Sequence, residues 1–186
     1  MALIDRVKNI IASPRTEWPV IAQESSTVGS LYTGYIMILA AIGPIAMIVR
    51  SPLLLLGVAI VSYLIALVVT YLLALIVDAL APTFGGEKDF TQSLKLVAYA
   101  HTAAWIAGIF RLIPWLGGVL MLIAGVYSIY TFYLGAPVLR KATAEKAAGF
   151  TIVVVLCAIV LGAVLGTVLI STLFGGAMLA GMGLFS

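Results

Sequence analysis

The chain has 186 residues, of which 63% are hydrophobic and only 9% are charged, with a formal net charge of +3 at pH 7. Soluble globular domains carry about 25% charged residues, so this composition excludes an ordinary water-soluble domain and favours an integral membrane protein. The net charge gives no support for nucleic-acid binding, because the basic residues flank apolar segments as they do on the cytoplasmic face of membrane proteins.

The first 30 residues are predicted to form a cytoplasmic, interfacial segment. Residues 2–12 have an apolar and a polar face at helical spacing, with Leu3, Ile4, Val7, Ile10 and Ile11 opposite Asp5, Arg6, Lys8 and Asn9. Such an amphipathic helix either lies flat at the headgroup level or caps the bundle from the cytoplasm. Trp18 follows it and is expected to anchor the segment at the membrane interface.

Five apolar stretches follow, each of about 17 to 25 residues, the length at which a helix crosses a hydrocarbon core of about 30 Å. They cover residues 31–49, 53–77, 94–110, 116–134 and 150–174. The predicted fold class is therefore an all-α membrane protein, a five-transmembrane-helix bundle over residues 31–174 with the N-terminal amphipathic helix before it. Residues 175–186 form an apolar, glycine-rich outer tail, which either extends the last helix outward or lies along the outer interface. Pro44 predicts a bend in the first span, because proline cannot donate a backbone hydrogen bond.

The distribution of charge predicts the orientation of the bundle. With the N-terminus in the cytoplasm, eight of the ten Lys and Arg residues lie on the inner side, the exceptions being Arg50 and Arg111. All seven acidic residues lie there too. Because Lys and Arg resist translocation, we expect a cytoplasmic N-terminus and an external C-terminus. The outer connections are short, so partner recognition is expected at the inner loops.

The loop after the second span is the strongest local candidate for a partner-binding site. Asp78 faces the negative end of a helix dipole and is costly there unless it is paired. Two interpretations are open: a plain helix stop and turn, or a shaped loop that presents Phe84 and acidic groups to a partner, or backbone amides to an anion. The candidate residues are Asp78, Pro82, Phe84, Gly85, Gly86 and Glu87.

His101 is the only histidine in the sequence. Counted from Lys95, it lies about 9 Å into the bilayer, where an ionisable group has to face protein or water. It is either a neutral histidine that is hydrogen-bonded between helices or part of an intramembrane polar cluster. The candidate cluster consists of Tyr99, His101, Thr102, Tyr127 and Tyr130. The tyrosines of the fourth span also fit an interfacial aromatic belt.

The fifth span has small residues at four-residue intervals, Ala158, Gly162 and Gly166, a pattern that allows helices to approach closely. It predicts either a dimer seam or ordinary packing inside one bundle. Cys157 is the single cysteine, so no internal disulfide is expected. The sequence contains no paired carboxylates within a span, nucleophile elbow or metal-ligand cluster. We therefore expect no catalytic residues, metal or cofactor, and no enzymatic activity.

Three segments carry a family resemblance: RVKNIIASPRTEWPVI near the N-terminus, APTFGGEKDF in the first inner loop, and YSIYTFYLGAPVLRK at the end of the fourth span. Together they resemble bacterial members of the Yip1 family. The resemblance implies a five-span bundle with a cytoplasmic N-terminus, in a bacterial inner membrane. Eukaryotic relatives act in vesicle traffic and bind Rab-type GTPases; for bacterial members the resemblance implies a membrane protein of poorly defined biochemistry.

The leading functional hypothesis is a non-enzymatic membrane protein that binds a protein or lipid partner through its cytoplasmic face, in membrane organisation or trafficking. One alternative is a small transporter or channel for an ion, proton or small solute, with a polar path near His101. A further alternative is lipid transfer between leaflets. The expected partners are membrane lipids, a cytoplasmic or membrane protein, and a second copy of the chain, with no nucleic acid.

Overall fold

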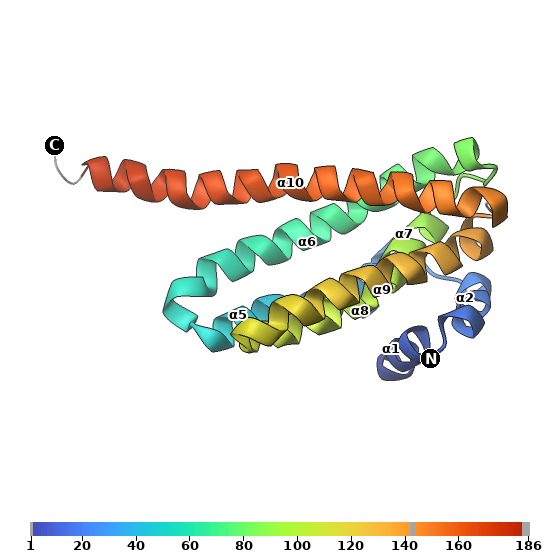
Figure 1. Cartoon of the computed structure of the whole chain (residues 1–186), viewed down its shortest axis with the longest axis horizontal. Coiled ribbons are helices and arrows are strands. Elements are labelled where there is room, and N and C mark those ends of the chain that lie inside the picture. Colours follow the sequence, from blue (N-terminus) through green and yellow to red (C-terminus); the bar gives the residue numbers. More distant parts are fainter. Residues whose placement is uncertain (1, 142–143, 184–186) are drawn as a thin grey trace.

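The computed structural model describes residues 2–141 and 144–183, and the regular elements among them are all helices. The longer helices run between the two ends of an elongated bundle (Figure 1). We call the end that holds α2, the last turn of α9 and the first turn of α10 the charged end, and the end that holds the turn from α5 to α6 the opposite end. The membrane-crossing part therefore starts near the charged end, at α3, and finishes beyond the opposite end, with the end of α10.

The N-terminal third begins with two short helices at the charged end and then runs to the opposite end. Its elements are α1 (Leu3–Ala12), α2 (Pro14–Gln23), α3 (Val28–Leu31), the π-helix η1 (Tyr32–Ile36), α4 (Met37–Ala40) and α5 (Ile42–Arg50). A capping box between Thr27 and Ser30 starts this run. The helix is interrupted at Ala41, where Pro44 has no N–H to bond the carbonyl of Ala40.

The chain returns to the charged end through α6 (Pro52–Leu80) and the 3₁₀ turn η2 (Ala81–Phe84). Pro52 lies in the first turn of α6, where a backbone N–H would have no acceptor within the helix, so that the lack of an N–H in proline costs no hydrogen bond. Gly85 follows η2 with a φ of 80°, a left-handed conformation that glycine adopts without steric cost. The proline and glycines of the inner loop therefore end the helix, as the sequence indicated.

The segment predicted as the third span is divided between α7 (Phe90–Ala100), α8 (Thr102–Ala107) and the 3₁₀ helix η3 (Gly108–Leu112). Asp89 caps α7 by accepting a hydrogen bond from the backbone N–H of Gln92. The division at His101 coincides with extra side-chain bonds to backbone carbonyls. The ring Nδ1 of His101 lies 2.8 Å from the carbonyl oxygen of Val97, and the Thr102 hydroxyl donates to the carbonyl of Tyr99 at 2.7 Å. Such bonds compete with the helical ladder and bend helices.

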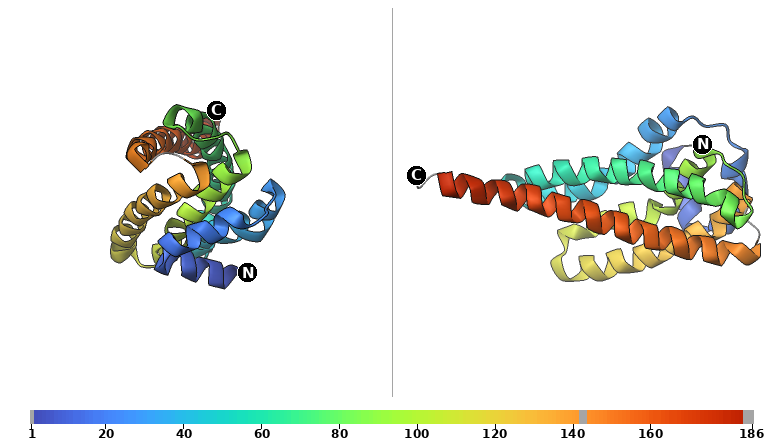
Figure 2. Two further views of the ribbon diagram at one scale, coloured as in Figure 1. Left: turned by 90° about the vertical axis from the view of Figure 1, so that its right-hand side faces the viewer. Right: turned by 90° about the horizontal axis from the view of Figure 1, so that it is seen from above.

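The last two helices, α9 (Pro114–Arg140) and α10 (Ala144–Gly183), run toward and away from the charged end. With 40 residues, α10 is about 60 Å long and extends past the opposite end of the bundle (Figures 1 and 2). It packs beside α6 and α9. Its helix continues to Gly183 through most of the stretch predicted as an outer tail; residues 184–186 lie outside the described residues.

Four helical stretches within the described residues are long and apolar enough to cross a membrane: Val28–Arg50, Leu55–Phe84, Trp115–Arg140 and Glu145–Thr167. The predicted span over residues 94–110 is not among them. The first part of its segment is instead enclosed by the fold, since every residue from Ser93 to Ala100 is buried, whereas Ile109 near its end is 48% exposed. The prediction of an all-helical membrane bundle is thus confirmed, while the count of five crossings stays a prediction.

The bundle is packed unevenly along its length. The buried core gathers around α7 near the charged end, and includes Trp18 and Ile21 of α2, Leu73 and Val77 of α6, Phe132 and Ala136 of α9, and Phe150 of α10. Toward the opposite end, the helices expose large apolar side chains, such as Leu56, Ile60 and Leu64 of α6, Trp115, Leu122 and Val126 of α9, and Ile159, Val160 and Val164 of α10. A continuous apolar surface of this kind is stable in the hydrocarbon of a bilayer.

Candidate functional site

The two N-terminal helices are part of the packed core at the charged end. Ile10, Trp18 and Ile21 are each at most 1% exposed. The indole Nε1 of Trp18 donates to the carbonyl of Thr131 at 3.1 Å, and the hydroxyl of Tyr127 donates to the carbonyl of Ile11 at 2.6 Å. Trp18 was expected to anchor the segment at the membrane interface, but it is buried against α9. Its aromatic ring fits there because the facing residue of α9 is Gly135.

A buried cluster of charges joins these helices to the bundle. Arg6 is only 4% exposed, although it was assigned to the polar face of its helix, whereas Ile4 is 73% exposed. The Arg6 guanidinium forms ion pairs with Glu17 and Glu24 and lies 5.7 Å from the ring centroid of Tyr99. Buried charges are stable only when they are paired in this way. Arg6 stands three residues after Leu3 and four before Ile10, a spacing that places it on the buried face and that sequence reasoning overlooked.

Lys95 provides a second buried link between α7 and the N-terminal segment. It is 1% exposed, and its ammonium donates to the carbonyl oxygens of Ile21, at 3.1 Å, and of Glu24. These carbonyls lie at the C-terminal end of α2, where backbone acceptors lack helical partners and a positive charge is favourable. Lys95 therefore caps α2 from the neighbouring helix, a role that the sequence did not indicate.

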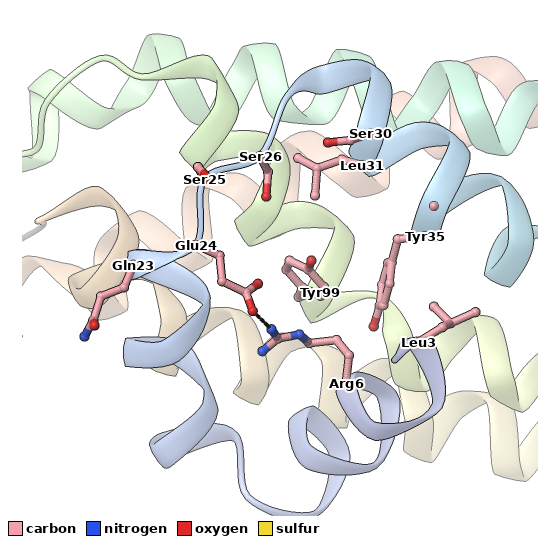
Figure 3. A pocket seen from close by; sticks show the side chains of 11 residues that line it. Leu3, Arg6, Gln23, Glu24, Ser25, Ser26, Ser30, Leu31, Tyr35 and Tyr99 are labelled. Atoms are coloured by element: carbon pink, nitrogen blue, oxygen red, sulfur yellow. Dashed lines mark hydrogen bonds and ion pairs between the residues drawn. The ribbon is translucent and has the colours of Figure 1, made fainter. Parts of the chain in front are cut away.

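A pocket of about 540 Å³ opens beside this cluster, between α1, the linker after α2 and the first span. Figure 3 shows the Arg6–Glu24 pair on one side and Tyr35 and Tyr99 on the other. The remaining lining residues are Leu3, Gln23, Ser25, Ser26, Ser30, Leu31 and Gly34. The wall thus combines serine hydroxyls, a carboxylate and a guanidinium with apolar and aromatic surface.

The tyrosine side of this pocket is held by hydrogen bonds and ring contacts. The hydroxyl of Tyr35 lies 2.6 Å from the hydroxyl of Thr102, and its ring centroid lies 4.5 Å from that of Tyr99 in an edge-on arrangement. Tyr35 and Gly34 belong to the π-helix η1, and short π-helical turns are frequent at functional sites. The irregular turn in the first span therefore forms part of the pocket wall.

The inner loop after α6 is held by Arg140, which is 1% exposed. Its guanidinium donates to Asp78 Oδ1 at 3.1 Å, to the carbonyl of Asp89 at 2.6 Å and to the carbonyl of Glu87. Asp78 also accepts hydrogen bonds from the backbone N–H of Asp89, at 2.8 Å, and from the hydroxyl of Ser93. Asp78, the acidic residue near the end of α6 for which the sequence predicted a partner, is therefore paired with Arg140, the last residue of α9.

The six candidate loop residues divide into an inward and an outward group. Asp78, Phe84 and Gly86 are partly buried; the ring of Phe84 packs 5.3 Å from that of Phe150. Pro82, Gly85 and Glu87 are exposed, and Glu87 pairs with Lys141 at 2.9 Å on the surface. The outward surface of the loop consequently presents Pro82, Gly85 and Glu87, whereas Phe84 contacts the bundle.

The close approach of the loop to α9 gives a testable consequence at Gly86. A Cβ on Gly86 would lie 2.3 Å from the carbonyl oxygen of Arg140, and a backbone atom cannot rotate away. We expect Gly86→Ala to displace the loop and to lower the thermal midpoint of the protein in detergent. Gly34→Ala is the control, because no atom lies within 4 Å of that Cβ. Equal midpoints for the two variants would contradict the close contact.

The residues of the candidate polar cluster lie in three separate places. Tyr99 and Thr102 face Tyr35 on the first span. Tyr127 donates a hydrogen bond to the carbonyl of Ile11 in α1, and its ring centroid lies 5.8 Å from that of Tyr130, which is exposed. His101 lines a different pocket, of about 280 Å³, in which most of the lining is apolar and Ser128 is a polar neighbour. The structure therefore brings Tyr99 and Thr102 together, but not with His101.

The small residues of the fifth span also differ in their surroundings. Ala158 packs against the core, while no atom of the described chain lies within 4 Å of a Cβ built on Gly162 or Gly166. Both glycines thus face open space in this chain. Within residues 2–141 and 144–183, no group of three or more His, Cys, Asp or Glu side chains is placed to hold a metal ion.

Comparison with protein-family models matches residues 8–166 to the Yip1 domain. No curated protein and no solved structure matches the chain. The matched region includes the second half of α1, all of α2, the inner loop and the bundle as far as residue 166 in α10. Together with the membrane-spanning helices, it identifies the protein as an integral membrane protein. The chain belongs to the Yip1 family.

Proposed function

We propose that this Yip1-family protein is a non-enzymatic membrane protein that binds a protein or lipid partner at the charged end of its bundle, and thereby acts in membrane organisation or trafficking. One observation carries the proposal: the 540 Å³ pocket lies at the charged end, between the docked N-terminal helices and the first span. Its wall carries charged and hydroxyl groups, and precisely placed polar groups of this kind fix the orientation of a ligand and give a binding site its specificity.

The proposed orientation places the charged end in the cytoplasm of a bacterial cell, with the C-terminus outside. Support comes from the basic residues, of which only Arg50, at the end of α5, and Arg111, which lines a pocket together with Arg50, belong to the opposite end. In this arrangement α7, α8 and η3 form a fifth crossing. Two backbone hydrogen bonds continue the helix across His101, from its N–H to Val97 and from the N–H of Trp105 to its carbonyl.

The geometry gives less support to transport through the bundle than to binding at its end. A polar path needs His101 to face other polar side chains, yet His101 lines a mainly apolar pocket and Tyr99 faces the other side. Transfer of lipid between leaflets would need a polar groove along the bilayer normal, and the pocket beside Arg6 lies at one end.

Site-specific photo-crosslinking in native membranes tests the proposed function. A photoreactive amino acid is placed at Ser26, beside the pocket, or at Glu87, on the inner loop. Trp115, which is 93% exposed at the start of α9, is the control at the opposite end. We expect discrete adducts, of protein or of one lipid class, from Ser26 or Glu87 and only unselective adducts from Trp115.

The same adduct pattern at all three positions would contradict binding at the charged end. Purified protein in liposomes provides a second measurement. A solute or proton flux that is lost in His101→Ala would support the transporter alternative and overturn a function that depends on binding alone.

A further inference from the structure

We propose that the pocket beside Arg6 binds the headgroup of an amine-bearing phospholipid, of the phosphatidylethanolamine class, from the leaflet at the charged end. This inference rests on the proposed function and names the ligand for it. It depends on three observations: the depth of the pocket in the bilayer, the charges that its wall exposes, and the apolar surface that leads away from it.

Exposed aromatic residues indicate where the hydrocarbon layer begins and ends. Trp115, at the start of α9, is 93% exposed, while Tyr130 and Tyr133, toward its other end, are 41% and 40% exposed. Trp and Tyr with one wet and one apolar side concentrate at the two membrane interfaces. The rise along α9 from Trp115 is about 22 Å to Tyr130 and about 27 Å to Tyr133. This distance approaches the thickness of a bilayer core.

The same measure places the pocket at the headgroup level. Arg50 lies at the opposite end of the first span, and the rise along the span from Arg50 to Tyr35 is about 22 Å. This is the same rise as from Trp115 to Tyr130 in α9. Ser30 lies one turn and a half beyond Tyr35, toward the charged end. The pocket wall from Tyr35 to Ser30 therefore lies where the lipid phosphates and amines of one leaflet are found.

The charge that the wall offers to a ligand is negative. The side chain of Arg6 is 5% exposed and is engaged by Glu17, Glu24 and the ring of Tyr99. The ammonium of Lys95 is engaged by two carbonyl oxygens. The side chain of Glu24 is 36% exposed and gives one carboxylate oxygen, Oε1, to Arg6. A ligand that enters the pocket therefore meets a carboxylate first, which favours an ammonium group.

Hydroxyl groups stand beside this carboxylate. Ser25 and Ser26 line the pocket directly after Glu24, and hydroxyls donate hydrogen bonds to phosphate oxygens. The hydroxyl of Ser30, which also lines the pocket, donates to the carbonyl of Thr27 instead. A zwitterionic headgroup with a primary amine uses both features, the ammonium at Glu24 and the phosphate at the serines. An anionic headgroup without an amine, such as that of phosphatidylglycerol, would place its charge near Glu24 without compensation. Such like-charge contact provides discrimination between lipids.

An apolar surface continues from the pocket into the hydrocarbon layer. Gly34 lines the pocket, and Met37 and Ile38, one turn further along the first span, are 39% and 49% exposed. Ile45 and Val49 extend this strip toward the opposite end, at 56% and 65% exposure. A polar pocket at the interface with an apolar strip beside it matches an amphiphile, with the headgroup in the pocket and an acyl chain along the strip. A soluble metabolite would make no use of the strip.

Native mass spectrometry of the detergent-purified protein, with added phosphatidylethanolamine or phosphatidylglycerol, tests the assignment. We expect at least tenfold more retained phosphatidylethanolamine than phosphatidylglycerol. Gly34→Leu fills the pocket mouth and is expected to lower retention of phosphatidylethanolamine at least tenfold. The matched control is Gly57→Leu on α6, which lies outside the pocket, since a Cβ on either glycine meets no neighbouring side chain or helix within 4 Å. Glu24→Gln is expected to remove the preference for the amine, whereas Glu145→Gln, at an exposed site on α10, keeps it.

Each other outcome overturns the assignment in a recognisable way. Equal retention of the two lipids by the unmodified protein excludes amine recognition, and unchanged retention in Gly34→Leu excludes the pocket. Displacement of the lipid by soluble phosphoethanolamine at equal concentration indicates a site for a metabolite instead. Adducts to a protein at Ser26 in the crosslinking experiment, without retained phosphatidylethanolamine, would support the proposed function while excluding this ligand.

Discussion

Replacing Trp18 with alanine is expected to lower the free energy of unfolding by about 3–5 kcal/mol, the range measured when large buried aromatic side chains are truncated. Trp18 is fully buried, and it links α2 both to the carbonyl of Thr131 and to the rings near Tyr99, whose centroid lies 6.4 Å from its own. Unfolding by SDS titration from mild micelles measures the change. Limited proteolysis is expected to cut α1 and α2 first, since they lose their main attachment.

Gly135 provides the complementary test of the same contact. A Cβ on Gly135 would lie 2.5 Å from Cε2 of Trp18 and 2.7 Å from Cδ1 of Leu96. We expect Gly135→Val to release α2 and to give the protease pattern of Trp18→Ala. Gly118→Val, on the open face of α9, is the matched control, with unchanged protease resistance. If Gly135→Val and Gly118→Val behave alike, α2 does not dock in this position.

The second large effect is expected at Arg140. Substitution by methionine keeps much of the apolar stem but removes the donors to Asp78, Asp89 and Glu87. Breaking a buried ion pair from one side typically costs about 3–5 kcal/mol, and we expect about 2–4 kcal/mol here because Asp78 retains bonds from Asp89 and Ser93. SDS titration again gives the free energy, and hydrogen exchange of the loop amides reports whether the inner loop opens.

The neighbouring Lys141 supplies the control for Arg140. Its ion pair with Glu87 is 70% exposed on both sides, and exposed pairs contribute at most about 1 kcal/mol. Lys141→Ala is therefore expected to leave unfolding and loop exchange almost unchanged. A large effect of Lys141→Ala together with a small effect of Arg140→Met would reverse the assignment of which residue holds the loop.

The membrane class and the approximate helices follow from the sequence because they depend on local length and hydropathy. A stretch of apolar residues predicts a span wherever the helix that it would form is as long as the bilayer core is thick. Four of the predicted spans coincide with helices that can cross a membrane. The interruption at His101 has no such local signal, since neither proline nor glycine stands there. It coincides with bonds from the side chains of His101 and Thr102 to the carbonyls of Val97 and Tyr99, which form only in the folded helix.

The candidate site was less accessible to sequence reasoning because its contacts join distant residues. Glu17 and Glu24 reach Arg6 across a turn between helices, and Asp78 reaches Arg140 from 62 residues away. The sequence did indicate that Asp78 requires a partner, since an acid at the C-terminal end of a helix opposes the dipole. It did not identify that partner. Trp18 was assigned to the membrane interface because a tryptophan just before a span fits the interface as well as it fits the buried core, in which the structure places it.

The docking of Trp18 on α9 has a consequence for biogenesis. The hydrogen bond from Trp18 joins residues 113 positions apart, so its acceptor does not exist while the N-terminal helices are being synthesised. Contacts between residues far apart in the chain form late in folding. The two N-terminal helices thus wait, with their apolar side chains uncovered, until α9 has been synthesised. Truncation before α9 would leave these helices as a target for chaperones and proteases.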